Sequence, residues 1–577
     1  MPVPAELVLT GGPVYTPDAA GRRMVPAAGP GGRPVTAVAV TGGRIAAVGA
    51  PGDDRIAELT GPRTEVVSLR GRALLPGFQD AHAHPAFTGV TMVACNLMDA
   101  ATLPDALAVI SAYARAHPEQ EWITGSGWRM EWFPGGLPDR RALDAVVGDR
   151  PAYLVNRDWH GAWVSSAALA RAGIDARTPD PPDGRIEREA DGTPQGTLHE
   201  GAASLVGALV PEPSLAQRVT GLLLAQRHLH ARGVTAWQDA IIGDYLGALD
   251  PLPAYLAAAA AGQLTARVRG ALWWDRGRGA GQLPDLLARR ERAQAAAAAG
   301  ERAARFVAGT VKIMQDGVAE NQTAAMIDPY LSPVHCQHDG AAHEAGHRGR
   351  SHVDPQELRA HVTALDAAGF QVHVHAIGDR AVREALDAFE AALAAHGERD
   401  HRHHIAHLQV VQPADVPRFA ALGVTANMQA LWAAHEPQMD ELTVPFLGPE
   451  RSARQYVFGE LRDAGARLAA GSDWGVTSAN PLKAIHVAVN RALPGATGAG
   501  AEPFLSAQRL DLAQALAAYT LGSAYVNHLD SETGRVRPGF LADLAVLAAD
   551  PFAGRADEIG NISVEQTYVS GERVFGG

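Results

Sequence analysis

The chain has 577 residues, of which 47% are hydrophobic and 20% are charged, and its formal net charge is −13. At ~150 residues per domain, this length predicts about two or three domains. The negative charge argues against nucleic acid and anionic membranes as partners, because both bind basic surfaces.

Three local features of the sequence indicate where in the cell the protein is expected. No apolar run approaches the ~18 residues of a membrane span, and the N-terminus lacks the basic-then-apolar pattern of a signal peptide. Cys95 and Cys336 form no CxxC motif and indicate no disulfide framework. We therefore expect a cytoplasmic protein that acts on a small-molecule substrate, and a homodimer is left open.

Residues 1–75 alternate short β-rich runs with glycine turns. The step Thr41-Gly42-Gly43 lies between two of these runs and predicts a β-hairpin. The runs cover residues 6–9, 36–40, 43–48 and 65–69.

The next run is apolar and ends in the segment Asp-Ala-His-Ala-His, which contains His82 and His84. In a β-strand, residues i and i+2 point to the same face and lie about 7 Å apart. Two imidazoles placed in this way can converge on one metal ion. The alternative is a pair of packed, hydrogen-bonded histidines, so other strands must supply further ligands to decide the matter.

Residues 76–530 alternate apolar strands with Ala/Leu/Arg-rich helical patterns, which favours an α/β fold of the (β/α)8 TIM-barrel type. The first two predicted strands are much farther apart than the others, so we expect residues 90–225 to form an inserted subdomain. The eight strands are predicted to end near His84, Asp239, Trp274, Lys312, His375, His407, Gln429 and Asp473.

Lysine is rare in this chain, because Lys312 and Lys483 are the only lysines among the 50 basic residues. Lys312 lies in the fourth of the predicted strands. An unpaired ammonium in an apolar strand would cost several kcal/mol. Carboxylation would convert Lys312 into an anionic carbamate that can bridge two metal ions. The alternative is a salt bridge to Asp316 or to another carboxylate of the barrel.

The fifth and sixth strands supply further imidazoles. His373 and His375 share one face, and His375 lies nearer the strand end, so it is the better candidate for a ligand while His373 lies one layer deeper. In the sixth strand His407 follows the apolar pair Ile405-Ala406 and is the best inward candidate. The nearby histidines expected to be solvated or to lie behind the ligands are His401, His403 and His404.

The eighth strand ends in Asp473, whose carboxylate can bind a metal ion and can also act as a general base. After it, residues 531–577 return to short β-rich runs like those of residues 1–75. Because both ends of the chain are rich in strands, we expect them to build one small β-sandwich together.

With these motifs in view, the chain resembles the amidohydrolase superfamily, and within it the amidohydrolase-3 group of YtcJ-like and N-substituted formamide deformylase-like proteins. The resemblance covers nearly the whole chain. It implies a barrel with a β-sandwich from both termini, and metal-dependent hydrolysis of C–N bonds. The motifs that carry it are PGFQDAHAHP, HGAWVSSAAL, GTLHE, VKIMQDGVAENQTAAMIDPY, HVHAIGDRAV, HHIAHLQ, GSDW and GRVRPGFLADLAVL.

The resemblance also implies a set of site residues. Lys312 stands where binuclear members carry a bridging carboxylated lysine. One or two divalent ions, most plausibly zinc, would activate a water molecule for attack. Asp473 would act as general base, and His375 is a second candidate catalytic residue. The metal ligands carried over by position are His82, His84, His375, His407 and Asp473.

The walls of the site are expected to come from the strand-end loops and the insertion. His160 is the preferred residue to orient the substrate carbonyl. The sequence departs from the family pattern at Ser165, at Ala406 and in the Val-Ala-Glu-Asn-Gln-Thr run after Gly317, which leaves substrate identity open. The candidate substrate-binding residues are His160, Trp159, Glu200, Gln429 and Trp432.

Three other functions are compatible with parts of this pattern. A mononuclear deaminase uses the same barrel, but Lys312 would then have no role, and Ala-Ile-Gly-Asp follows His375 where a glutamate would be expected. A metal-dependent decarboxylase or isomerase could share every ligand. A non-catalytic binding scaffold is disfavoured, because such relatives lose ligands that this chain retains.

Overall fold

The computed structural model describes residues 3–246, 248–331 and 347–576, so Cys336 lies outside the described residues. Its centre is an eight-stranded parallel sheet in the order β21-β20-β19-β18-β17-β16-β15-β8. All eight predicted strands are present, and each ends within three residues of the predicted position. They are β8 (Phe78–Ala83), β15 (Val234–Ile242), β16 (Arg267–Trp273), β17 (Phe306–Met314), β18 (Gln371–Ala376), β19 (His404–His407), β20 (Thr425–Met428) and β21 (Leu468–Ala470).

The two outer strands of this sheet, β8 and β21, meet through the residues that follow β21. The Asp473 N–H donates to the His82 carbonyl at 2.8 Å, and the His84 N–H donates to the Trp474 carbonyl at 2.7 Å. Ala83 and Trp474 form a parallel bridge between these bonds. The fold is therefore a TIM-type barrel, and it closes at the two histidines singled out in the sequence.

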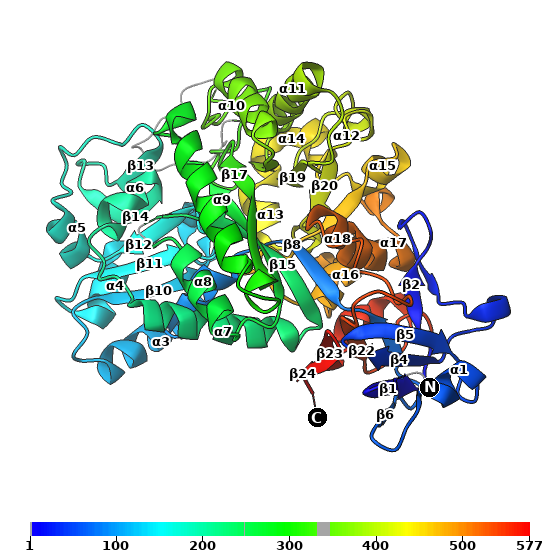
Figure 1. Cartoon of the computed structure of the whole chain (residues 1–577). Helices are drawn as coiled ribbons and strands as arrows, with labels where there is room; N and C mark the ends of the chain where they lie inside the picture. The colour runs from blue at the N-terminus through cyan, green and yellow to red at the C-terminus, as the bar shows by residue number, and fades with distance from the viewer. Residues whose placement is uncertain (1–2, 247, 332–346, 577) are drawn as a thin grey trace.

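Helices cover the outside of the barrel between successive strands (Figure 1). In α11, for example, Val382, Leu386 and Phe389 recur at helical spacing and are buried against the barrel. The helix ends before Gly397, whose φ of +72° favours glycine. The covering helices include α7 (Leu215–His230), α8 (Leu252–Ala260), α9 (Leu283–Ala297), α10 (Pro355–Ala367), α11 (Asp379–His396), α12 (Val416–Ala421) and α15 (Phe458–Asp463).

A separate six-stranded sheet forms the large insertion between β8 and β15, and it lies at the opposite side of the molecule from the two termini (Figure 1). It is flanked by α3 (Leu103–Ala116), α4 (Arg140–Val147) and α5 (Ser166–Ala172) and has its own apolar core. The ends of the insertion at residues 90 and 225 remain a prediction. Its strands are β9 (Cys95–Asn96), β10 (Ile123–Trp128), β11 (Ala152–Asn156), β12 (Gly161–Val164), β13 (Gly184–Arg188) and β14 (Pro194–Glu200).

Both ends of the chain build a β-sandwich, as the strand-rich termini predict. The predicted hairpin is present, with Gly42 and Gly43 at positive φ between β4 and β5. Inner faces of both sheets share one core, for example Leu9 and Val38 against Val546. One sheet contains β1 (Leu7–Thr10), β4 (Ala37–Thr41), β5 (Arg44–Gly49) and β6 (Glu65–Ser68), and the other contains β7 (Ala73–Pro76), β22 (Leu544–Leu547), β23 (Val564–Val569) and β24 (Glu572–Phe575).

The sandwich holds the start of β8 in place. β7 pairs with β22 and leads directly into β8, and the Gly77 N–H donates to the Asp543 carbonyl at 2.8 Å. The buried Asp543 carboxylate in turn accepts two hydrogen bonds from Arg267 of β16, at 2.8 and 3.1 Å. β8, which carries His82, is thus anchored at its base.

Among the described residues, no helix is long and apolar enough to cross a membrane.

Candidate metal centre

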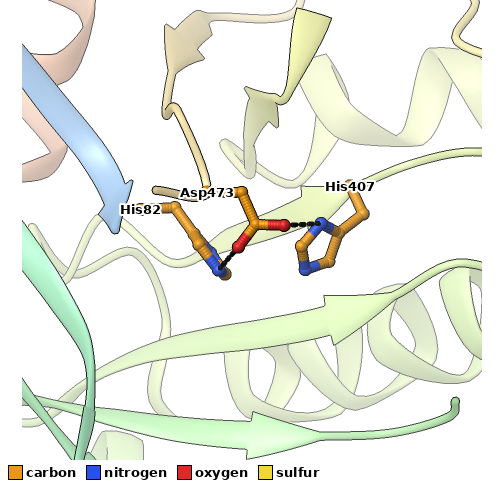
Figure 2. Close-up of side chains that lie close together, drawn as sticks. All are labelled: His82, His407 and Asp473. Atoms are coloured by element: carbon orange, nitrogen blue, oxygen red, sulfur yellow. Dashed lines mark ion pairs between the residues drawn. The ribbon is translucent and has the colours of Figure 1, made fainter. Parts of the chain in front are cut away.

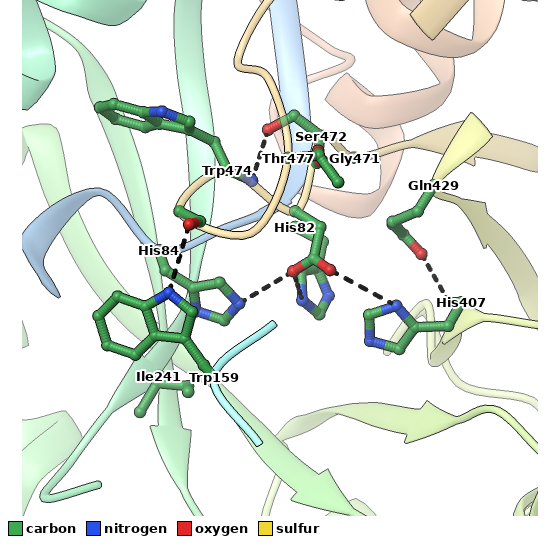
Figure 3. A network of polar contacts seen from close by, with 12 residues as sticks. His82, His84, Trp159, Ile241, His407, Gln429, Gly471, Ser472, Trp474 and Thr477 are labelled. Carbon is green, nitrogen blue, oxygen red and sulfur yellow. Dashed lines mark hydrogen bonds and ion pairs between the residues drawn. The ribbon is translucent and has the colours of Figure 1, made fainter. Parts of the chain in front are cut away.

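Two histidines at the end of the first barrel strand, His82 in β8 and His84 directly after it, converge on one carboxylate oxygen. His82 Nε2 lies 3.2 Å and His84 Nε2 lies 3.1 Å from Asp473 Oδ1. The rings are edge-to-face, with centroids 5.1 Å apart. Figure 3 shows both imidazoles turned to the same point. The i, i+2 spacing of a strand thus places both side chains at the mouth of the barrel, as expected.

Asp473 and His407 complete the group. Asp473 lies beyond the end of β21 with a φ of +57°, and its Oδ2 is 4.0 Å from His407 Nδ1. His407 also has a positive φ, of +78°, and its N–H donates to the Gln429 side-chain oxygen at 2.6 Å. Non-glycine residues in this region of backbone space are uncommon and cluster at functional sites. Both side chains are therefore aimed by backbone held in place by surrounding hydrogen bonds.

His82, His407 and Asp473 each offer a ligand atom, and these atoms lie within 4.8 Å of one another (Figure 2). Two ligands each about 2.1 Å from a shared zinc ion cannot be more than ~4.2 Å apart, so small side-chain shifts suffice. His84 adds a buried Nδ1 that forms no hydrogen bond with any of the described residues. Imidazoles with a carboxylate are a donor set that zinc favours. The residues present fit a divalent ion.

The charge states of these groups also suit a metal ion. Burial lowers the pKa of His407 to about 3 and holds the pKa of His82 and His375 well below the usual value. Burial raises the pKa of Asp473, but the adjacent imidazoles of His82 and His84 outweigh it and hold that pKa well below its usual range. Neutral imidazoles keep a lone pair for a metal, and the carboxylate keeps its charge.

Lys312 lies inside the same centre. Its Nζ is 3.3 Å from His373 Nε2 and 3.5 Å from His82 Nδ1, and no described carboxylate lies within ion-pair distance of it. A salt bridge to Asp316 is therefore wrong, because the Asp316 carboxylate instead accepts backbone N–H groups. Burial lowers the pKa of Lys312 to about 7. A fraction of neutral amine is thus present near neutral pH, and this form is the one that carboxylation requires.

A chain of amides sets which nitrogen of His82 carries its proton. The Gln371 amide nitrogen donates to two backbone carbonyls, so its oxygen accepts from Gln238 at 3.1 Å. The Gln238 oxygen then accepts from His373 Nδ1 at 2.7 Å, which leaves His373 Nε2 as acceptor from His82 Nδ1 at 2.9 Å. His82 Nε2 therefore has the free lone pair, and it is the nitrogen that faces Asp473.

His375 lies on the other side of the centre from this chain. Its Nε2 is 3.1 Å from the Gly317 carbonyl, and its ring lies edge-to-face against His407 with centroids 4.4 Å apart. It lines the cavity but does not belong to the tight group of three. As expected, His373 lies deeper, since it is fully buried and does not reach the cavity.

The cavity above the centre has a volume of about 60 Å³. Of the five expected wall residues, Trp159, His160 and Trp432 line it. Glu200 and Gln429 do not, because Glu200 lies behind His160 and Gln429 lies behind His407. The wall residues that the sequence analysis did not single out come from strand ends, loops and one helix, and include Asp158, Ile241, Tyr245, Trp273, Met314, Glu320, Gln438 and Tyr456.

His160 and Glu200 form a buried ion pair at the cavity wall, with His160 Nδ1 2.8 Å from Glu200 Oε1. Burial alone would lower the pKa of His160, but the Glu200 carboxylate raises it to about 9. The same contact outweighs the effect of burial on Glu200 and lowers its pKa to about 2. Near neutral pH, His160 is thus an imidazolium whose second N–H can donate to a substrate oxygen.

Asp366, His401 and His403 form a second group with metal-like spacing, near the start of β19. The Val372 N–H donates to His403 Nδ1 at 2.9 Å, so His403 carries its proton on Nε2 and donates it to Asp366. A protonated nitrogen cannot bind a metal. Asp366 also accepts from His396 and His401, so this group is a hydrogen-bonded carboxylate.

Comparison with known proteins agrees with this geometry. A family model described as "Amidohydrolase family" matches residues 65–575. The putative amidohydrolase YtcJ of Bacillus subtilis (strain 168) is 28% identical over 90% of this chain and 93% of its own. The N-substituted formamide deformylase of Arthrobacter pascens is 28% identical over 93% of this chain and 94% of its own.

The fold has solved counterparts as well. The structure of an uncharacterized metal-dependent hydrolase from Pyrococcus horikoshii OT3 superimposes with a TM-score of 0.68 and 23% identity. It covers 95% of this chain and 99% of its own. At this identity the likeness shows the fold alone.

Proposed function

The chain belongs to the amidohydrolase family of metal-dependent hydrolases, and we propose that it cleaves a non-peptide C–N bond in an amide or N-substituted formamide. The observation that carries the proposal is the convergence of His82, His407 and Asp473 at the mouth of the barrel, with Lys312 directly beneath. The similarity to an N-substituted formamide deformylase supports the choice of bond.

The ion would be held by the side chains that converge on Asp473, with His375 at the edge of the group. We propose zinc, and two ions where Lys312 is carboxylated, because the carbamate would add an oxygen ligand between them. When bound, such an ion makes a water molecule easier to deprotonate and polarises the scissile carbonyl. The residues proposed to hold it are His82, His84, Lys312, His375, His407 and Asp473.

The protein's own groups then have separate roles. Asp473 is ionised, so it can take the proton of the attacking water on a carboxylate oxygen and return it to the departing amine nitrogen. His160 donates its free N–H to the carbonyl oxygen as negative charge develops there. Trp159 and Trp432 narrow the small cavity and exclude bulk water.

Lys312 also favours hydrolysis at a binuclear site over the mononuclear deaminase. A buried lysine without a carboxylate partner has no role in a single-ion site, whereas a carbamate there would meet two ions. The residues that follow His375 include no glutamate up to Asp379, which agrees with the same choice.

The test combines metal analysis with a substrate panel. Purified protein should contain one to two divalent ions per chain, and it should hydrolyse at least one class among N-formyl, N-acetyl, cyclic amide and carbamate compounds. His407→Ala should lose metal and activity together, whereas His401→Ala, the same change in the hydrogen-bonded group of Asp366, should keep both. Protein that is fully folded and active without metal would refute the proposal.

A further inference from the structure

The loop after β17 is held rigidly over the cavity. The Asp316 carboxylate accepts backbone N–H groups from Ala325, Ile377 and Gly378, at 2.8 to 3.0 Å. Gly378 packs so closely that an added Cβ would lie 2.0 Å from the Ala325 carbonyl oxygen. Within the loop the Val318 N–H also donates to the Thr323 hydroxyl and the Thr323 N–H to the Asn321 side-chain oxygen, so the backbone between Asp316 and Ala325 is fixed by hydrogen bonds.

Glu320 lies within this loop and lines the catalytic cavity. Among the described residues, no side chain forms a hydrogen bond or an ion pair with its carboxyl group. Two other acidic groups at the site do have such partners, since Asp473 contacts two histidines and Glu200 contacts His160. Burial, with a further contribution from nearby Asp158, raises the pKa of Glu320 to about 7. Within the described part of the chain, no cationic side chain forms an ion pair with this carboxyl group.

Asp158 lines the same part of the cavity. Its Oδ1 accepts the His160 N–H at 3.0 Å and an amide N–H of Asn156. Over the described ranges, no group donates to its Oδ2. The cavity wall thus presents two carboxyl groups with oxygens left to bind a ligand.

The cationic side chains around the cavity do not pair with these two carboxyl groups. No arginine is among the described residues that line the cavity, Lys312 lies within the metal centre, and the charge of His160 is matched by Glu200. Arg157 is turned away, with its guanidinium 5.5 Å from the Trp432 ring and its Nε donating to a backbone carbonyl. Aromatic faces such as those of Trp432 and Tyr456 also attract cations rather than anions.

We propose that Glu320, with Asp158 beside it, selects substrates that carry a positively charged nitrogen group beyond the scissile bond. The substrate class is an amide or formamide with an ammonium or guanidinium group on the part that points away from the metal centre. The reaction on this substrate rests on the proposed function, but the charge preference of the cavity is a property of binding and can be measured without turnover.

The probe pair is n-butylguanidinium and its neutral isostere N-butylurea, each titrated calorimetrically into the metal-loaded protein at neutral pH. Guanidinium stays protonated and is a poor metal ligand, so its binding reports on the carboxyl groups. A charged hydrogen bond of ordinary strength gives a preference of about tenfold or more for the cation. Glu320→Gln should reduce this preference to less than about threefold, and Asp158→Asn should reduce it by a smaller factor.

Glu436→Gln is the matched control. Glu436 lies near Arg157, and like Glu320 it is an acidic residue with a raised pKa. It does not line the cavity, so this variant should keep the preference for butylguanidinium over butylurea. The proposal is overturned if butylurea binds the native protein as tightly as butylguanidinium, or if the two glutamine variants behave alike. Should Glu320→Gln not fold, Glu320→Asp retracts the charge by one methylene and must weaken only the binding of the cation.

Failure of this inference and failure of the proposed function have different signatures. A protein that hydrolyses neutral amides without any charge preference refutes the role of Glu320 alone. A protein that prefers butylguanidinium through Glu320 but hydrolyses no amide or formamide refutes the reaction alone.

Discussion

His373 Nε2 lies 2.9 Å from His82 Nδ1, and this contact determines which nitrogen of His82 faces the metal centre. The order of hydrogen-bond donors behind this contact runs from Gln371 of β18 to Gln238 of β15 and back to His373 of β18. Partners of this kind orient a ligand and raise its basicity. The metal centre therefore depends on residues that touch neither the ion nor the substrate.

Replacing Gln238 with leucine should weaken metal binding. Without the Gln238 oxygen, His373 can carry its proton on either nitrogen, and His82 loses its preference for a free Nε2. Loss of such a partner costs about 10- to 100-fold in metal affinity. Competition with a chelator measures the change. Gln226→Leu, which removes another buried glutamine far from the centre, should leave metal affinity unchanged, and equal losses in both variants would contradict the role of Gln238.

Lys312→Arg should reduce the metal content from two ions to one in protein loaded in the presence of bicarbonate. Arginine keeps the positive charge, but its guanidinium does not form a carbamate. We expect kcat/KM to fall at least about 100-fold, because a second Lewis acid and its bridging ligand are lost. The chain provides its own control in Lys483→Arg, which changes the only other lysine, at an exposed position. Undiminished metal content and activity in Lys312→Arg would exclude the bridging role.

The activity should fall as the pH rises past about 9. His160 has its pKa raised to about 9, so its imidazolium is present below that pH and is lost above it. Glu200→Gln removes the carboxylate that raises this pKa, and the descending limb of the kcat/KM profile should then move to lower pH. Stopped assays across pH 6 to about 10.5 measure the shift. If kcat/KM falls at the same pH in the native protein and in Glu200→Gln, His160 is not the group whose titration causes the fall.

Asp366→Asn should destabilise the fold without removing metal. Asp366 is buried and accepts from His396, His401 and His403, and hydrogen bonds to a charged group contribute about 1.5–3 kcal/mol each. These contacts outweigh the effect of burial and hold the pKa of Asp366 well below its usual value. The stabilisation is therefore complete above the unfolded-state pKa of about 3.9 and is lost as the pH falls through the lower folded-state value.

Thermal unfolding of this variant at neutral pH and in acid measures the effect. The difference in Tm between Asp366→Asn and the native protein should be largest at neutral pH and should shrink towards acid. Asp387→Asn, which removes a more exposed carboxylate paired with Arg359 and Arg418, should have a much smaller effect. Loss of metal from Asp366→Asn would show instead that this group is a metal site.

Much of the barrel could be predicted because the relevant patterns are local. The period of two in β8 placed His82 and His84 on one face, and the last inward residue of an apolar strand was the right place to look for His407. The hairpin at Gly42-Gly43 followed from turn chemistry in the same way. The residues that line the cavity were harder to predict. Glu200 and Gln429 do not line it, because Glu200 contacts His160 from behind and Gln429 contacts His407 from behind.

The sequence by itself determined the barrel, the sandwich of the two termini and the candidate ligands, because strand periodicity and residue chemistry act over a few positions. Only the tertiary structure decided the contacts among strands and loops distant in sequence. It brought Gln238 to His373, directed the Asp316 carboxylate to backbone N–H groups, and placed Glu320 in the wall of the cavity. The physical reason is that strand register and loop course depend on packing across the whole fold, and no local pattern encodes which side chains then meet.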